Sequence, residues 1–78
     1  ELFTLADARV GATIVLRQVD DEDAARLRYL ADQGLTPGTR LSVLERQPFN
    51  GPTTVQSGAI TRVVGQELAG LLWCEEVV

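Results

Sequence analysis

Several residue types on which catalysis and metal binding commonly depend are missing from this chain of 78 residues. It contains no His, no Met and no Lys, and Cys74 is its only cysteine. One thiol excludes a disulfide within the chain, and too few Cys and His are present for a zinc finger. Catalysis by Ser-His-Asp or Cys-His groups needs an imidazole base, and we do not expect an enzyme. A metal site made from this chain alone must therefore use oxygen ligands.

The charged residues give no sign of nucleic-acid binding. All seven basic residues are arginines, scattered among eleven acidic ones, and the formal net charge is −4. We therefore expect no direct contact with nucleic acid. No apolar run approaches the ~18 residues of a membrane-spanning helix, so we expect no membrane insertion. Because the chain begins with Glu1 rather than Met, we expect residues 1–78 to be one domain from a longer protein.

Alternating and β-branched stretches predict five short strands. In the last one we expect Leu72 and Cys74 to face inward and Trp73 outward, with Cys74 as a small core residue. A short helical turn is predicted over 65–71, before that strand. Five short strands with one long connection favour a small closed barrel, which is an all-β fold. The expected strands are 12–19, 39–46, 53–57, 60–64 and 72–77.

One helix is predicted after the first strand, over about 21–33. We expect Asp20 to cap its N-terminus, Asp23 to occupy the third helical position and Gly34 to end it in a left-handed conformation. Its apolar stripe consists of Ala24, Leu27, Leu30 and Ala31.

Two connecting segments also carry predictions. In the lead-in at 2–10, Leu5, Ala8 and Val10 are candidate core residues. In the loop at 48–52, the pair Asn50-Gly51 is a strong hairpin signal.

Four motifs in this order resemble those of the FeoA family of small SH3-like barrels. They are the lead-in 5–11, the helix and turn 27–38 ending in Leu35-Thr36-Pro37-Gly38, the hairpin 48–52 and the turn 64–69. The resemblance covers nearly the whole chain. It implies a five-stranded SH3-like barrel with one helix.

Family members occur in two settings, and the resemblance implies a cytoplasmic protein in either. One is the C-terminal domain of DtxR-type repressors, which sense manganese or ferrous iron as homodimers. The acidic run 20–23 before 27–30 is similar to such repressors and favours this setting. The domain would then dock on the metal-binding domain of the same protein. The alternative is the stand-alone FeoA accessory of the ferrous iron permease FeoB.

The resemblance also points to candidate metal ligands. In some of these repressors the barrel lends oxygen ligands, from the region between strand and helix, to an ancillary divalent metal. Here Asp20, Glu22 and Asp23 lie nearest those positions, and another domain would complete the site. Helix capping also explains the same acidic residues, and we favour it over a ligand role. We expect the isolated domain to bind divalent metal weakly or not at all.

Two aromatic residues are candidates for a protein interface. Phe49 lies in the predicted hairpin loop, where it either contacts a partner or folds back to plug the barrel end. Trp73 lies on the predicted outer face of the last strand. A groove for proline-rich peptides is not expected, because the few aromatic residues are spread along the chain.

Overall fold

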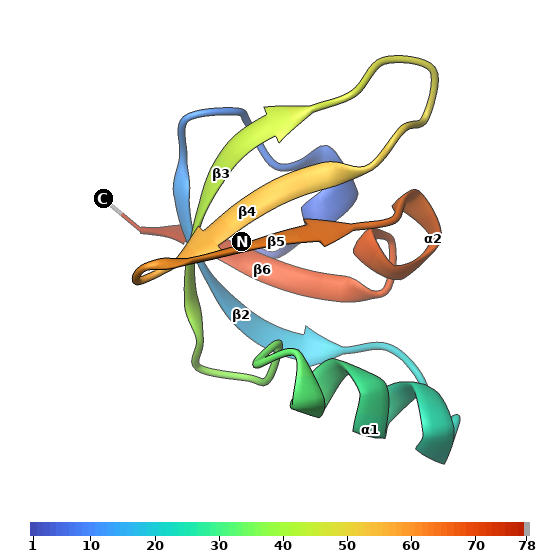
Figure 1. Ribbon diagram of the computed structural model, residues 1–78. Coiled ribbons are helices and arrows are strands. Elements are labelled where there is room, and N and C mark those ends of the chain that lie inside the picture. The colour runs from blue at the N-terminus through green and yellow to red at the C-terminus, as the bar shows by residue number, and fades with distance from the viewer. Residues whose placement is uncertain (78) are drawn as a thin grey trace.

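A computed structural model describes residues 1–77 as one curled antiparallel sheet with two short helices (Figure 1). In chain order the elements are β1 (Phe3–Thr4), the 3-10 turn η1 (Leu5–Asp7), β2 (Thr13–Val19), α1 (Ala24–Asp32), β3 (Arg40–Arg46), β4 (Thr53–Ser57), β5 (Ile60–Val64), α2 (Gln66–Ala69) and β6 (Leu72–Val77).

The sheet has six strands in the order β1-β6-β2-β3-β4-β5. It curls strongly, so the principal extents of the chain are nearly equal at 31, 28 and 27 Å. This confirms the predicted mostly-β architecture with one long helix between the first two long strands. The strand count differs from five because Phe3 and Thr4 form a short additional strand, paired with Cys74 and Trp73 of β6.

The core fills the inside of the curl with alternate side chains from each long strand. The pattern of β2 left its inward face ambiguous, and the structure resolves this. Ile14 and Leu16 are fully buried in the main cluster, whereas Val15 is buried outside it. The other strands contribute Leu41, Val43, Val55, Val64, Leu72 and Cys74.

The lead-in is held against the core at two of its three predicted positions. Leu5 and Ala8 are buried, but the prediction for Val10 is wrong because half of its surface is exposed. The chain reverses at Gly11, which has a φ of +93°. The N–H of Gly11 then donates to the carbonyl of Val43 at 2.8 Å. This reversal directs the next strand into the sheet and leaves Val10 outside.

Helix α1 ends as predicted, at a glycine in the left-handed region. Gly34 has a φ of +77°. Its N–H donates to Ala31, and the N–H of Leu35 donates to the carbonyl of Leu30 at 2.8 Å. This pair of bonds is the Schellman motif. The two residues joined by the bond with the greater sequence separation, here Leu30 and Leu35, are commonly apolar in this motif. Leu30 and Leu35 are both buried.

The hairpin between β3 and β4 turns one residue earlier than the Asn-Gly pair predicted. Positive φ values occur at Phe49 (60°) and Asn50 (61°), and the N–H of Gly51 donates to the carbonyl of Pro48 at 3.2 Å. Gly51 is instead required because its backbone lies too close to Gln47 for a side chain to fit. A Cβ atom at this position would lie 2.5 Å from the Cβ of Gln47.

A buried hydroxyl in β4 gives a first prediction. Thr53 is fully buried, and its Oγ1 has no hydrogen-bond partner within residues 1–77. Because Val has nearly the same shape without the hydroxyl, Thr53→Val is expected to stabilise the domain by about 1 kcal/mol. Urea unfolding measures this. Thr54→Val, on the other face of the same strand, is the control, and a loss of stability in Thr53→Val would contradict the prediction.

Candidate functional site

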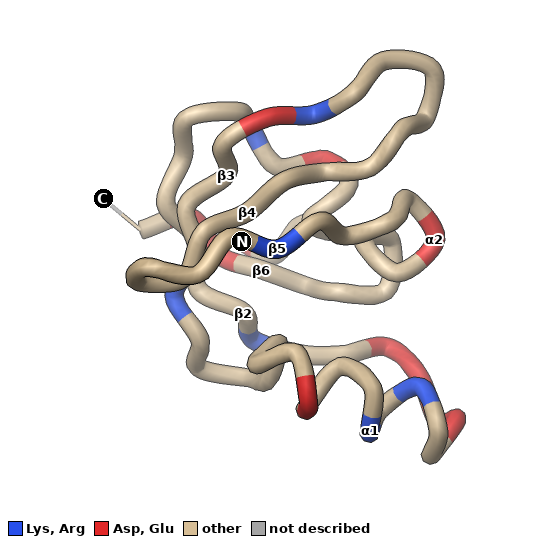
Figure 2. The backbone as a smooth tube through the Cα atoms, viewed as in Figure 1, with Lys and Arg blue, Asp and Glu red and all other residues tan. Residues whose placement is uncertain are grey.

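The acidic stretch at 20–23 leads from β2 into α1 (Figure 2). Asp23 is the N-cap of the helix, since its Oδ1 accepts hydrogen bonds from the N–H groups of Ala25 (2.9 Å) and Arg26 (3.2 Å). The helix therefore begins at Ala24 and not at residue 21. The prediction that Asp20 caps it is wrong.

Local bonds made by the acidic residues explain the late start. Oδ1 of Asp21 accepts a hydrogen bond from the N–H of Asp23 at 3.1 Å, a turn that competes with helical bonding. Its Oδ2 lies 2.9 Å from Nε of Arg26. The N–H of Asp20 donates to the carbonyl of Leu71 at 2.8 Å. The backbone of the run is thus tied to the connection before β6.

The carboxylates of the candidate metal ligands differ in whether they already accept hydrogen bonds within the domain. The backbone N–H groups of Arg26 and Ala25 lower the pKa of the Asp23 carboxyl, so it is engaged as a charged cap. Asp20 and Glu22 are exposed, and their carboxylates face solvent. Within residues 1–77 no three Asp, Glu, Cys or His side chains come together as a metal site.

The cap predicts a pH effect on stability. The pKa of Asp23 in the folded chain lies below its ordinary value of 3.8. Its stabilising contribution is therefore complete above the unfolded-state pKa and is lost as the pH falls through the lower folded value. We expect Asp23→Ala to lower the melting temperature at pH 7, because the cap is lost.

Asp23→Asn is the matched control, because Asn caps helices about as well as Asp but has no carboxyl to titrate. It should retain the melting temperature at pH 7 and lose this contribution to the acid dependence. Far-UV circular dichroism between about pH 7 and pH 2 measures both effects. Equal melting temperatures for the Ala variant and the parent chain at pH 7 would contradict the assignment.

The two aromatic candidates lie in different surroundings. Phe49 is 98% exposed at the hairpin tip, so it does not fold back onto the barrel end. Trp73 lies on the opposite face of β6 from Leu72, as predicted, but it is partly buried. It pairs with Thr4 of β1 on one side and Gln18 of β2 on the other, so the additional strand flanks it. An interface role for either residue stays a prediction.

Cys74 is fully buried in β6, as predicted. Burial raises the pKa of its thiol from 9.0 to about 11. The thiolate is the nucleophilic and metal-binding form of cysteine. Near neutral pH the side chain therefore acts as a small core residue.

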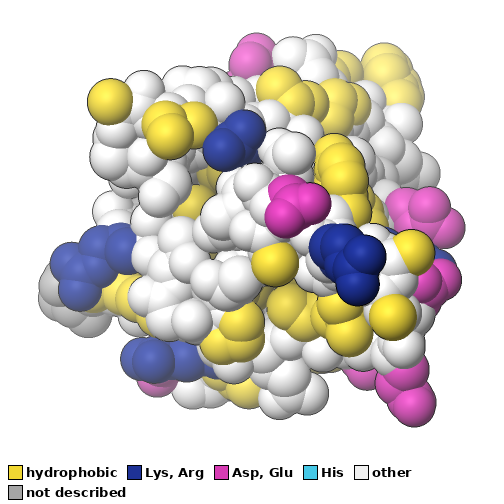
Figure 3. Space-filling view, turned by 60° about the horizontal axis from the view of Figure 1, so that its bottom comes forward, with side chains coloured by type: hydrophobic (Ala, Val, Ile, Leu, Met, Phe, Trp, Pro, Cys, Tyr) yellow, Lys and Arg dark blue, Asp and Glu magenta, His cyan; other side chains and the backbone are white. Residues whose placement is uncertain are grey.

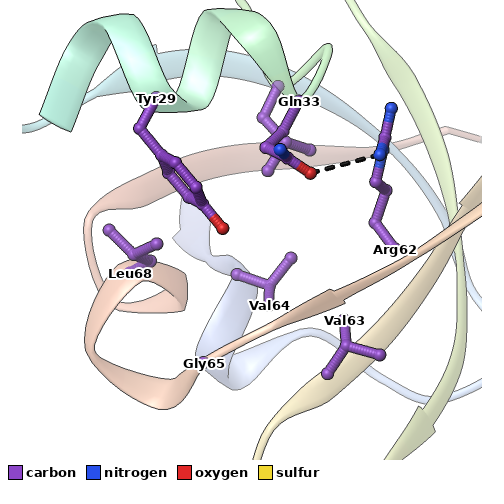
Figure 4. A pocket seen from close by; sticks show the side chains of 8 residues that line it. Tyr29, Gln33, Arg62, Val63, Val64, Gly65 and Leu68 are labelled. Carbon is purple, nitrogen blue, oxygen red and sulfur yellow. Dashed lines mark hydrogen bonds between the residues drawn. The ribbon is translucent and has the colours of Figure 1, made fainter.

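A small pocket that is open to solvent lies between α1, β5 and α2, where residue patterns gave no prediction (Figure 4). The Tyr29 hydroxyl points into it from α1. Arg62 reaches across from β5, and its Nη1 donates to Oε1 of Gln33 at 3.2 Å. The other lining residues are Leu35, Val63, Val64, Gly65 and Leu68.

Some residues of this pocket follow patterns that can be recognised in the sequence. Tyr29 and Gln33 are four residues apart, the spacing that puts two side chains on one helix face. Arg62 is the only charged residue of its strand. Nothing in either pattern indicated that this helix face and this strand meet, because that contact depends on the curl of the whole sheet.

The curled six-stranded sheet with a helix between its first two long strands defines a small SH3-like domain. The model of the FeoA domain family matches residues 3–76. The chain belongs to this family, which confirms the resemblance of its motifs. No curated protein matches the chain in sequence.

Solved structures of two kinds are similar to the chain. A crystal structure of an iron uptake regulatory protein, FeoA, is 25% identical with a TM-score of 0.85, and the match covers 99% of both chains. A manganese-dependent transcriptional repressor in complex with manganese is 30% identical with a TM-score of 0.89. That match covers 97% of this chain but 37% of the repressor. A second structure of a manganese-dependent transcriptional repressor has 30% identity, a TM-score of 0.88 and 42% coverage of the repressor.

The same fold occurs in iron(II) transport protein A from Clostridium thermocellum, at 17% identity and a TM-score of 0.86 over 96% of this chain and 46% of that one. Within residues 1–77, no helix combines the length and apolar character needed to cross a membrane.

Proposed function

We propose that the chain is the regulatory FeoA domain of a metal-dependent transcriptional repressor of the DtxR type, acting in the cytoplasm. The observation that carries the proposal is the similarity to the manganese-dependent repressors, at 30% identity and TM-scores of 0.88 and 0.89 over 97% of the chain. The corresponding values for the FeoA protein are 25% and 0.85. The domain docks on the metal-binding domain of its own protein, which acts as a homodimer.

Docking regulates the repressor by shifting its conformational equilibrium. A domain that binds the metal-loaded state better than the metal-free state stabilises the loaded state by the difference in binding free energy. The domain needs no catalytic group for this role. By reciprocity, manganese or ferrous iron then tightens the docking.

The acidic run supplies the contact to metal in this proposal. Asp20 and Glu22 offer solvent-exposed carboxylates, and oxygen ligands suit manganese and ferrous iron. Asp23 remains a candidate through its Oδ2, since its Oδ1 accepts both capping bonds. The chain has no imidazole, so the remaining ligands come from the metal-binding domain.

The first experiment determines the size of the natural protein. An antibody against this chain should detect, in cell extract, a polypeptide much longer than 78 residues. In that longer protein, deletion of these residues should raise the manganese concentration needed for half-maximal operator binding in a gel-shift titration. A natural polypeptide no longer than this chain would contradict the proposal.

Metal titration of the 78-residue chain tests the acidic run separately. Calorimetry with manganese and with anaerobic ferrous iron should show weak binding or none. The variant Asp20→Ala/Glu22→Ala leaves the Asp23 cap intact and serves as the comparison. Saturable micromolar binding that this variant loses would show a self-sufficient site and contradict the proposed completion by another domain.

The stand-alone transport accessory is the second candidate, because the match to the FeoA protein covers 99% of both chains. Its partner is then the ferrous iron permease. Co-purification of a short natural polypeptide with that permease from detergent-solubilised membranes would favour this candidate.

A further inference from the structure

The pocket between α1 and β5 combines one basic side chain with several apolar ones. The domain carries a net charge of −4, yet neither Asp nor Glu is among the residues that line the pocket. The nearest acidic residues in sequence, Asp32 and Glu67, are exposed. The pocket is therefore a basic depression in an acidic domain.

Arg62 supplies the positive charge. Its guanidinium is partly buried, and its hydrogen bond to a side chain goes to the neutral amide of Gln33. In the part of the chain that the structure describes, no carboxylate lies within 4.0 Å of it, as is also true of Arg28, Arg40 and Arg46. Arg9 and Arg17 each have one carboxylate at that distance, and Arg26 has two. A partly desolvated guanidinium gains most from a carboxylate, which accepts two parallel hydrogen bonds from it.

The other walls are apolar. The Tyr29 ring and Leu68 stand on one side of the pocket and Val64 forms its floor, while the Tyr29 hydroxyl points into the space (Figure 4). Apolar atoms also reach the surface in patches beside arginine side chains on the face turned toward α1 (Figure 3). The space between these side chains is open to solvent, so a segment would lie across the pocket rather than be enclosed by it.

We propose that this pocket binds a short segment of a partner protein that carries a carboxylate next to an aliphatic side chain. The carboxylate pairs with Arg62, and the aliphatic side chain packs against Tyr29 and Leu68. Charge complementarity identifies the occupant, because a basic or neutral segment would leave the guanidinium without a counter-charge. The site is separate from the acidic run, and the inference stands whether the domain serves a repressor or a permease.

The experiment uses the 78-residue chain and two capped tetrapeptides in ¹⁵N-¹H correlation spectra. One peptide alternates glutamate and leucine, and the other replaces each glutamate with glutamine. The glutamate peptide should give saturable shifts at Tyr29, Arg62 and Leu68 that weaken as salt is added. The glutamine peptide should bind at least about tenfold more weakly, as expected for a lost charge-assisted hydrogen bond.

Matched variants distinguish binding by Arg62 in the pocket from a general effect of the net charge of the domain. Arg62→Gln should weaken binding of the glutamate peptide by about tenfold or more, and Arg62→Lys by less, because it keeps the charge but not the planar fork. Arg40→Gln removes an exposed arginine of β3 and should change affinity by no more than about twofold. Dispersed spectra show that each variant is folded.

Four results would overturn the proposal. They are no binding of the glutamate peptide, equal binding of the glutamine peptide, equal losses in Arg62→Gln and Arg40→Gln, and equal affinity for free acetate. The last result would show a site for anions alone. Each differs from a failure of the repressor proposal, which is decided by the length of the natural protein.

Discussion

Replacing Arg46 with Met is expected to destabilise the domain by about 2 kcal/mol. Arg46 ends β3, and its Nη2 donates to the carbonyls of Leu5 (3.0 Å) and Ala8. These two residues are 0% and 1% exposed, so water has little access to their carbonyls once the donor is gone. Hydrogen bonds to a charged group contribute roughly 1.5–3 kcal/mol, and Met keeps the length and packing of the arginine stem.

An opposing effect reduces the loss without reversing it. Nε of Arg46 is buried without a partner within residues 1–77, and removing such an orphan group gains about 1 kcal/mol or more. Two charge-assisted bonds outweigh one orphan nitrogen. The prediction is therefore a net loss close to the contribution of one such bond.

Urea unfolding followed by Trp73 fluorescence measures this change. Arg46→Lys should lose less, since an ammonium group still offers donors. Arg40→Met, an exposed position on the same strand, should change stability by no more than about 0.5 kcal/mol. A stability of Arg46→Met equal to that of the parent chain would show that the lead-in does not depend on these bonds.

The strands were predictable because their pattern is local. The runs 53–57, 60–64 and 72–77 were expected as strands and are β4, β5 and β6. Residues with high β-propensity, chiefly Thr, Val, Ile and Trp, are frequent in them, and glycine-containing segments lie between them. The strand at 3–4 was not predicted, because two residues hold no periodicity and pair only where β6 offers a free edge.

The start of α1 shows where local patterns fail. Three of the four acidic residues at 20–23 are aspartates, each of which suits a cap, so residue type alone does not decide among them. The choice of Asp23 follows from the bonds of Asp21 to its N–H and to Arg26, and from the backbone bond of Asp20 to Leu71. That last bond joins segments far apart in the sequence.

The pocket could not be predicted from local patterns either, because its walls come from segments far apart in the sequence. Its walls come from α1, β5 and α2, and the bond from Arg62 to Gln33 joins β5 to the end of α1.

The apolar stripe of the helix gave a wrong expectation of which helix residues are buried. Of Ala24, Leu27, Leu30 and Ala31, only Leu30 is buried. The stripe predicted the helix correctly but overstated how much of it the barrel covers.

Leu30→Ala is accordingly expected to cost about 3 kcal/mol, the usual range for a buried leucine being 2–5 kcal/mol. Leu30 is 1% exposed and is the only buried residue of α1. Leu35, which follows the helix, shares its Schellman bond and lies in the same core cluster. The smaller side chain leaves a cavity where the helix meets the sheet.

Leu27→Ala is the matched control, because Leu27 is 38% exposed on the same predicted stripe. It should cost less than about 1 kcal/mol. Urea unfolding gives both values, and hydrogen exchange of the α1 amides shows whether the helix loosens in Leu30→Ala. Equal losses for the two variants would mean that the whole stripe, and not one leucine, holds α1 on the barrel. Because Tyr29 reaches the pocket from α1 and Gln33 from the C-cap of that helix, a loosened helix should also weaken peptide binding without any change at Arg62.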